Sequence, residues 1–257
     1  MLAERVKTLK PAATIELSTK IREMKRSGVD IISLNIGEPD FAPPAAANDG
    51  VRAALDQNIS KYGPVPGFPE LREAICEKLR NDNGLTYRPD EICVSAGAKQ
   101  AIFNALFALC GAGDEVLLPT PCWVSYDQMV NLCGATPVPV RLRLENGFAL
   151  DVDAVERCIT PRTRAIVINT PNNPTGAVYS EESLCALGRL AVKYDFWIIS
   201  DEIYEKILFN GNTHFSVASV SEDVWSHCVT INGFSKAYAL PGWRVGYSAA
   251  PRTLAKA

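Results

Sequence analysis

Histidine is scarce in this sequence, which has only two among its 257 residues, His214 and His227. A histidine-based catalytic triad or metal cluster is therefore poorly supplied, and acid–base work is expected of lysine, carboxylate or tyrosine side chains. The eight cysteines stand singly, without the CxxC spacing typical of zinc sites and redox pairs. They indicate free thiols in a reducing compartment, and we expect no metal.

Strong net charge and long apolar runs are also missing. The formal net charge of -3 gives no basic surface for nucleic acid or anionic lipid. No stretch approaches the ~18 apolar residues of a membrane span, and residues 1–14 lack the apolar core of a signal peptide. We therefore expect a cytoplasmic protein that acts on small molecules, with an organelle as the alternative if a presequence has been removed.

Short apolar runs alternate with helical segments from residue 91 onwards. Seven runs are predicted as strands, at residues 92–95, 115–118, 136–140, 165–169, 197–200, 228–231 and 245–249. This alternation is typical of an α/β fold with a mostly parallel seven-stranded sheet and helices on both faces. The helices expected between these strands include residues 100–110, 125–132 and 180–194.

The first 90 residues follow a different pattern. Apolar periodicity predicts helices at 14–28, 48–58 and 69–81, and a short strand at 30–34. The segment NIGEPDFAPP after that strand is rich in Gly and Pro, which excludes regular structure. Gly37 in this loop could bring backbone close to a ligand, or the loop could be a plain connector.

Polar and aromatic residues follow the predicted strands at the point where each strand ends. They are Gly97, Ala98, Lys99, Trp123, Asn173, Asp201, Tyr204, Ser235 and Lys236. Ligands of such sheets bind outside the carboxyl ends of the strands. Since these groups come from five different loops, we expect them to converge on one site.

The stretch NGFSKAYALPGWRVGY, residues 232–247, carries the most informative of these groups. Lys236 at a strand end can lose its proton more readily than in water, as the formation of a Schiff base requires. Ser235 and Arg244 offer a hydroxyl donor and a planar guanidinium, which suit a phosphate. A lysine beside a phosphate site suggests pyridoxal phosphate.

Other residues suit the same cofactor, each with an ordinary alternative. Asp201 directly follows an apolar strand and needs a cationic partner such as a pyridinium nitrogen, unless it caps the next helix. Trp123 could stack on a ring or belong to the core. Asn173 and Tyr204 could hydrogen-bond a ring hydroxyl, and the bond between Asn173 and Pro174 could be cis. Tyr62 lies in a Pro/Gly loop, where it could contact a phosphate or a partner or simply pack.

The motifs LNIGEPDF, KYGPVPGFPELREAI, SAGAKQAIFN, TPNNPTG, SDEIYE and NGFSKAYALPGWRVGY occur in this order. Together they closely resemble the pyridoxal-phosphate-dependent class I aminotransferases of fold type I, in particular the aspartate/prephenate aminotransferase subgroup. The resemblance extends over nearly the whole chain. It implies the transfer of an amino group from aspartate or glutamate to a 2-oxo acid in a homodimer.

The resemblance also implies a role for each residue. Lys236 would form the Schiff base and move the proton between the substrate Cα and the cofactor, and Asp201 would pair with the pyridine nitrogen. The remaining cofactor contacts would come from Asn173 and Tyr204 at the ring oxygen, Trp123 on the ring, Ser235, Arg244, Ala98 and Lys99 at the phosphate, and Tyr62 at the phosphate of the neighbouring subunit.

Substrate contacts are implied as well. The substrate carboxylate would lie near Gly37, Trp123 and Asn173, and Lys99 is suited to the distal carboxylate of aspartate or glutamate. Members of the family run well beyond residue 257 and supply a C-terminal arginine for the α-carboxylate, and Arg252 is not that residue. We therefore expect a truncated chain that does not close properly on substrate. Its residues 1–45 would form an arm and part of a small domain, and residues 46–257 the large cofactor-binding domain.

Two alternatives are weighed against this function. One is a transaminase for aromatic or neutral amino acids, or a C–S lyase, of the same fold. The other is a non-catalytic module that binds pyridoxal phosphate or dimerises, which the incomplete C-terminus favours and the intact Lys236 disfavours.

Overall fold

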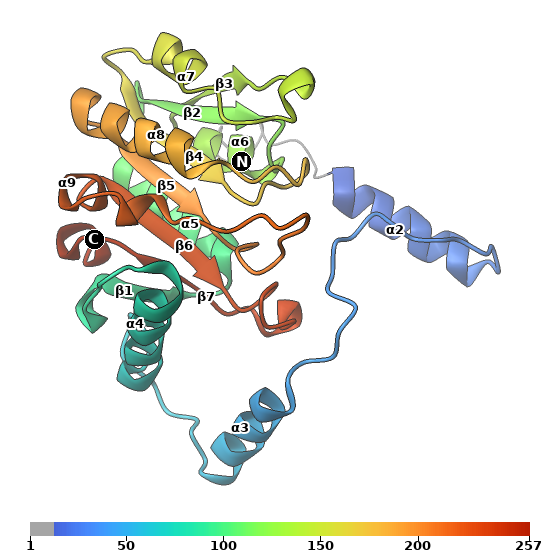
Figure 1. Cartoon of the computed structure of the whole chain (residues 1–257). Helices are drawn as coiled ribbons and strands as arrows, with labels where there is room; N and C mark the ends of the chain where they lie inside the picture. Colours follow the sequence, from blue (N-terminus) through green and yellow to red (C-terminus); the bar gives the residue numbers. More distant parts are fainter. Residues whose placement is uncertain (1–12) are drawn as a thin grey trace, which may run out of the picture.

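A seven-stranded sheet forms the centre of the chain in the computed structural model, which describes residues 13–257 (Figure 1). The strands are β1 (Ile92–Ser95), β2 (Glu115–Thr120), β3 (Thr136–Arg141), β4 (Thr163–Asn169), β5 (Trp197–Asp201), β6 (Cys228–Gly233) and β7 (Gly246–Ala249). All seven strands agree with the prediction to within two residues at each end; the largest differences are that β4 begins two residues early and that β2 and β6 each extend two residues further. The predicted α/β class and its mostly parallel sheet are confirmed.

The spatial order of the strands is β1-β7-β6-β5-β4-β2-β3. Strands β2 to β6 pair in parallel, whereas β7 is antiparallel to both of its neighbours, β1 and β6. Gly246 at the start of β7 is in register with Gly233 at the end of β6. The residues that precede β7 therefore lie at the edge where the parallel strands end.

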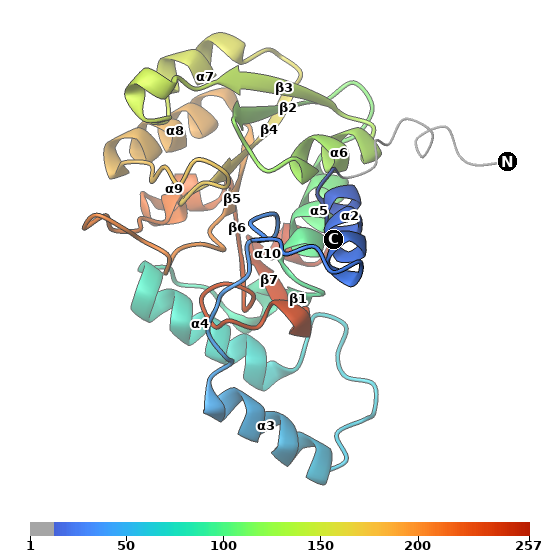
Figure 2. The same cartoon turned by 90° about the vertical axis from the view of Figure 1, so that its right-hand side faces the viewer.

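Helices cover both faces of the sheet, as predicted (Figure 2). One face packs against α4 (Pro69–Asn83), α7 (Val152–Cys158), α8 (Glu181–Tyr194) and α9 (Glu222–Trp225), and the other against α5 (Ala98–Leu109) and α6 (Ser125–Leu132). The short helix α10 (Arg252–Ala255) ends the chain. Side chains along β5 alternate between the two cores, with Ile198 in the first and Ile199 in the second.

The N-terminal elements α2 (Ala13–Arg26) and α3 (Ala45–Asp56) lie away from the sheet (Figure 1). Both helices were predicted, but the strand predicted at residues 30–34 is wrong, because this segment is irregular. Ile32 is 89% exposed and Leu34 is 91% exposed. A lone strand needs a paired neighbour, and its apolar side chains alone do not create one.

Two further observations concern the described residues. All eight cysteines are free, as the sequence predicted. Among the helices of residues 13–257, none is both long and apolar enough to span a membrane.

Candidate active site

Lys236 lies in the turn that follows β6, at the carboxyl edge of the parallel strands. Its Nζ donates a hydrogen bond to the carbonyl oxygen of Gly37, and it lies 5.7 Å from the centre of the Tyr204 ring. Burial lowers the pKa of Lys236, although the nearby Glu38 carboxylate acts in the opposite direction. The unprotonated amine, which can act as a base or a nucleophile, is therefore easier to reach than in water.

Asp201 ends β5 with its side chain buried. Its Oδ2 accepts a 2.6 Å hydrogen bond from the Tyr126 hydroxyl, and its Oδ1 accepts a 3.2 Å bond from the backbone N–H of Ile203. Burial raises the pKa of Asp201 to about 6, against the effect of these two hydrogen bonds. Within residues 13–257, Asp201 forms no ion pair with a lysine, arginine or histidine, so its charge lacks the cationic partner that burial demands.

Asn173 and Tyr204 meet beside this carboxylate. The Asn173 side chain donates a 3.3 Å hydrogen bond to the Tyr204 hydroxyl, and its backbone N–H donates a 2.7 Å bond to Asn169 Oδ1. Burial and the charge of Asp201 raise the pKa of Tyr204. The Asn173–Pro174 peptide bond is cis, as the sequence suggested.

Trp123 and Lys99 form the next part of the group. Lys99 Nζ lies 4.8 Å from the centre of a Trp123 ring, and Trp123 meets the Tyr126 ring edge-on at 5.5 Å. Burial lowers the pKa of Lys99, and the charge of Arg244 lowers it further. Through Tyr126, Trp123 is connected to Asp201, so these residues belong to one site.

Backbone geometry brings Arg244 against the start of α5. Gly97 precedes Ala98 with φ 86° and ψ 164°, a conformation essentially limited to glycine. A side chain at Gly97 would collide with the Arg244 guanidinium, and one at Gly246 would collide with the backbone of Gly97 and Ala98. The close approach places a guanidinium beside a helix N-terminus, a combination that favours an anion.

Arg244 itself is held by two backbone carbonyls. It donates hydrogen bonds to Pro241 at 2.8 Å and to Ala96 at 3.4 Å. Ser235 is partly buried in the turn beside Lys236. The guanidinium of Arg244 thus lies beside the helix start, whereas no described contact connects the Ser235 hydroxyl to either of them.

Tyr62 stands apart from the other predicted residues. It is fully exposed, in the loop between α3 and α4, and no described contact connects it to the site. Gly37 is brought to Lys236 by the hydrogen bond already described. Arg252 is paired with Asp90 at 2.7 Å.

Tyr126 is the residue that sequence reasoning missed. It lies in α6, a helix predicted at the correct bounds, and it is almost completely buried. Burial and the charge of Asp201 raise the pKa of Tyr126 well above its ordinary value, so it remains a hydrogen-bond donor. Its only sequence signal was a tyrosine in the first turn of an apolar helix after a strand, which is more typical of core packing.

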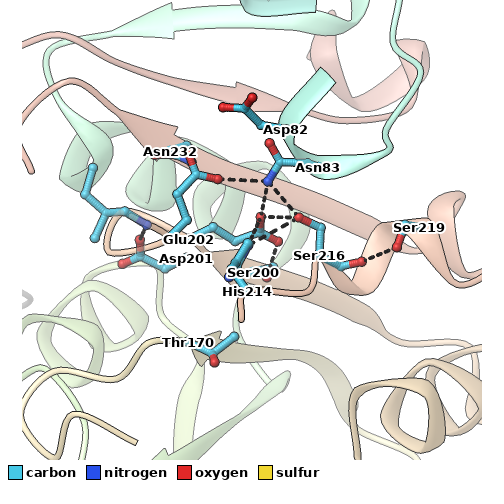
Figure 3. A network of polar contacts seen from close by, with 12 residues as sticks. Asp82, Asn83, Thr170, Ser200, Asp201, Glu202, His214, Ser216, Ser219 and Asn232 are labelled. Atoms are coloured by element: carbon cyan, nitrogen blue, oxygen red, sulfur yellow. Dashed lines mark hydrogen bonds and ion pairs between the residues drawn. The ribbon is translucent and has the colours of Figure 1, made fainter. Parts of the chain in front are cut away.

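A second polar cluster has ligand atoms close enough together for a metal site. Ligand atoms of Glu202, Glu205 and His214 lie within 4.8 Å of one another. However, Lys78 forms an ion pair with Glu205, and the Asn83 amide donates to both carboxylates. Figure 3 shows Asn83 beside Glu202. These donors occupy the space and the oxygens that a cation would need, so the cluster fits an internal network better than a metal.

The main site fits a planar cationic ring with an anionic arm. Asp201 offers an uncompensated buried carboxylate, and Lys236 offers an amine with a lowered pKa. Arg244 and the start of α5 offer the anion site. The donor set is therefore complementary at both ends of such a ligand.

The sequence is similar to those of known proteins. The family model for aminotransferase class I and II matches residues 29–257. An aspartate/prephenate aminotransferase of Thermus thermophilus is 48% identical over 256 residues, which cover 100% of this chain and 66% of that protein.

Solved structures of aminotransferases are similar to this chain as well. The aspartate aminotransferase of Thermus thermophilus with maleate superposes with a TM-score of 0.96 at 48% identity, covering 100% of this chain and 66% of that one. An aromatic aminotransferase of Pyrococcus horikoshii gives a TM-score of 0.86 at 42% identity, covering 92% of this chain and 63% of that one. The chain thus spans about two thirds of the length of these relatives.

Proposed function

Because this chain belongs to the class I and II aminotransferase family, we propose that it moves an amino group from aspartate or glutamate to a 2-oxo acid. The cofactor of the family is pyridoxal 5'-phosphate. The observation that carries the proposal is the buried Asp201, which lacks a cationic partner in a site that also holds the Lys236 amine.

Each end of the cofactor has its residues. Asp201 would hold the protonated pyridine nitrogen, Asn173 and Tyr204 the ring oxygen, and Trp123 the ring face. The phosphate would be held by Arg244, Ser235 and the backbone N–H groups of Ala98 and Lys99. When bound, the cofactor supplies an electron sink for the electron pair released at the substrate Cα.

Lys236 carries out the proton transfer. Its amine, with a lowered pKa, takes the proton from the substrate Cα and returns one during the second half of the reaction. In the first half the donor amino acid would leave as its 2-oxo acid and its amino group would stay with the cofactor, and in the second half this amino group would pass to another 2-oxo acid, which would leave as an amino acid. No external oxidant or reductant is needed. Asp201 would stabilise the proton on the cofactor's ring nitrogen in both halves.

Lys99 would select acidic substrates. Its ammonium group lies over Trp123 at the rim of the site, where it could bind a distal carboxylate. Gly37, Trp123 and Asn173 would surround the α-carboxylate. The names of the relatives, aspartate and aspartate/prephenate aminotransferase, support this choice.

The proposal is tested by half reactions with the cofactor-loaded protein. We expect aspartate and glutamate to change the cofactor absorbance faster than alanine or phenylalanine, and Lys99→Ala to slow only the two acidic substrates. Faster reaction with phenylalanine than with either acidic amino acid would contradict the assignment.

A transaminase for aromatic substrates is the second candidate. It is favoured by the likeness to an aromatic aminotransferase of Pyrococcus horikoshii, since nearly the same backbone serves that protein. The same half reactions distinguish the two. In this case phenylalanine would react fastest and Lys99→Ala would leave its rate unchanged.

We also propose a homodimer with shared active sites. Support comes from Tyr62, whose full exposure in the single chain suits a residue that reaches a neighbouring subunit. Residues 46–257 would form the cofactor-binding domain, with residues 1–45 as an arm and part of a small domain. Eight free cysteines favour a reducing compartment such as the cytoplasm.

A further inference from the structure

A buried polar network lies behind Asp201, on the opposite face of the sheet (Figure 3). We call it the Glu202 network, and its members are Asn83, Ser200, Glu202, Glu205, His214 and Ser216. None of these residues is among those that the resemblance assigned to cofactor or substrate. The network nevertheless includes the residues directly after Asp201 and Tyr204.

Strand alternation explains this arrangement. Along β5, Ile198 packs in the core under α4 and α8, and Ile199 packs in the core under α5 and α6. The same alternation places Asp201 toward Tyr126 of α6, and it places Ser200 and Glu202 toward α4. One turn of chain therefore carries a site carboxylate on one side and a network carboxylate on the other.

Glu202 is the centre of the network and is completely buried. Its Oε1 accepts a 3.0 Å hydrogen bond from Ser200, and its Oε2 accepts a 2.6 Å bond from Ser216. His214 Nε2 lies 2.9 Å from Oε2, and the Asn83 amide donates a 3.4 Å hydrogen bond to the same oxygen. Four neighbours thus fix one side chain, which cannot rotate without leaving buried donors unpaired.

Glu205 extends the network to α4. It accepts a 2.8 Å hydrogen bond from Asn83 and forms an ion pair with Lys78. Lys78 in turn donates a 2.7 Å bond to Asn83 Oδ1. Since Asn83 and Lys78 both belong to α4, the turn of residues 201–205 is tied to a helix that packs against the sheet.

The backbone around Asp201 is held by hydrogen bonds of its own. Its carbonyl accepts hydrogen bonds from the Asn169 side chain at 2.9 Å and from the Thr170 N–H at 3.3 Å, and Glu202 N–H donates to Ile231 at 2.9 Å. These bonds hold the Asp201–Glu202 peptide at its carbonyl and at its N–H, so the two residues belong to one fixed segment of backbone. The bonds to the Glu202 side chain anchor this segment from the far face of the sheet, and they thereby restrict the orientation of Asp201 as well.

We propose that Glu202 is a positioning residue for Asp201: held by Asn83, Ser216, His214 and Ser200, it fixes the carboxylate of Asp201 toward the cofactor nitrogen. This inference rests on the proposed function. It assigns a role in cofactor binding to a network on the far face of the sheet.

The test compares Glu202→Gln with the parent, using pyridoxal 5'-phosphate labelled with ¹⁵N at its ring nitrogen. In Glu202→Gln an NH₂ group replaces one carboxylate oxygen, so a hydrogen-bond donor faces the groups that donate to Glu202 in the parent. We expect the affinity of the cofactor-free chain for the cofactor to fall roughly tenfold, and the ¹⁵N resonance to move toward the unprotonated position. Ser216→Ala removes one hydroxyl that donates to Glu202, and it should change the affinity and the resonance in the same direction but less than Glu202→Gln does. It replaces Glu202→Gln in the test if that variant does not fold.

Two controls separate positioning from loss of stability. Ile166→Val truncates a buried residue in the core on the same face of the sheet without changing the network. It should lower the melting temperature about as much as the network variants do, but leave the cofactor affinity and the ¹⁵N resonance unchanged. In an Asp201→Asn background, Glu202→Gln should lower the affinity by less than about twofold, because the residue through which it acts is already changed.

Parent-like affinity and resonance in both Glu202→Gln and Ser216→Ala would overturn the inference, as would an equal loss of affinity with and without Asp201. If the parent itself fails to bind the cofactor, the proposed function fails, and the inference fails with it. These outcomes are distinguishable because the parent is measured first.

Discussion

At the scale of single residues, Asp201 carries the most information about this protein. A carboxylate that is almost completely buried and lacks a cationic partner among the described residues is costly to the chain on its own. It is expected where a ligand supplies the missing charge. The pKa of about 6 expresses this cost, since burial favours the neutral form.

This cost predicts how the stability of the cofactor-free chain changes with pH. The folded-state pKa of Asp201 lies above its ordinary value of 3.8, so its contribution to stability is full below that value and is lost as pH rises through about 6. We expect the free energy of unfolding of Asp201→Asn, relative to that of the parent, to rise by about 1–3 kcal/mol from pH 4 to pH 7.5. Urea denaturation of both proteins at the two pH values measures this difference, and a constant difference would contradict it.

Tyr126 gives a second prediction at this scale. Its hydroxyl donates to Asp201 at 2.6 Å and opposes the rise of the Asp201 pKa. Tyr126→Phe should lower the free energy of unfolding by about 1–3 kcal/mol at pH 7.5 and weaken cofactor binding at neutral pH.

Tyr179→Phe is the matched control for that change. The Tyr179 hydroxyl is buried and has no hydrogen-bond partner among the described residues. Its removal should leave stability unchanged or slightly improved, and cofactor affinity unaffected. Equal losses in the two variants would show that a buried hydroxyl, and not its bond to Asp201, accounts for the effect.

The sequence predicted some of these residues and not others for a physical reason. Asp201 directly follows a predicted apolar strand and Lys236 lies in the loop after another, and the end of a parallel strand is a local signal. Tyr126 and Asn83 act through partners 75 and 119 residues away. Nothing in their own neighbourhood in the sequence distinguishes them from core or surface residues.

At the scale of elements, the junction of β7 with α5 brings together the residues of the proposed anion site. Gly246 allows β7 to contact the backbone of Gly97 and Ala98, and Gly97 allows Arg244 to lie against the start of α5. Both contacts depend on the absence of a side chain. The helix N-terminus and the guanidinium would reach the same anion for this reason.

Gly97→Ala should therefore weaken phosphate binding. The new methyl group displaces Arg244, and the backbone conformation becomes strained by about 1–3 kcal/mol. We expect the affinity for pyridoxal 5'-phosphate to fall at least about tenfold, with little change for pyridoxal, which lacks the phosphate. Fluorescence titration with both compounds measures the two affinities.

Gly113→Ala provides the control for backbone strain. Gly113 also has a positive φ, 94°, but a side chain there meets nothing within 4 Å. This variant should lose stability without losing affinity for either compound. If it weakens phosphate binding as much as Gly97→Ala does, the contact with Arg244 is not the cause.

Element bounds were predictable where periodicity and end signals coincide, as for α6, whose bounds agree at both ends. The strand predicted at residues 30–34 failed because a short apolar run gives no information about whether a neighbouring strand exists. The start of α5 was placed two residues late, since Gly97 and not the apolar pattern sets it.

At the scale of the whole molecule, the order of the strands could not be predicted. The sequence indicated a mostly parallel sheet, but β7 enters between β1 and β6 and runs against both. This choice depends on contacts between segments more than 100 residues apart along the chain. It has a functional consequence, because only an antiparallel β7 brings Arg244 to the edge where Lys236 lies.

The exposed Tyr62 leads to a prediction about assembly. We expect the chain to sediment as a dimer at micromolar concentration, and Tyr62→Ala to weaken binding of the phosphorylated cofactor, but not of pyridoxal. The difference between variant and parent should vanish on dilution to the monomer, because the phosphate contact would come from the partner. A purely monomeric protein with parent-like affinity in Tyr62→Ala would contradict the shared site.

The central claim is that Lys236 holds the cofactor covalently, opposite Asp201. The most direct test is to mix the protein with pyridoxal 5'-phosphate, reduce it with borohydride and map the modified peptide by mass spectrometry, with Lys236→Ala as the control. We predict one cofactor per chain, attached to Lys236, and none in the variant. Attachment to another lysine, or equal attachment in Lys236→Ala, would contradict the account.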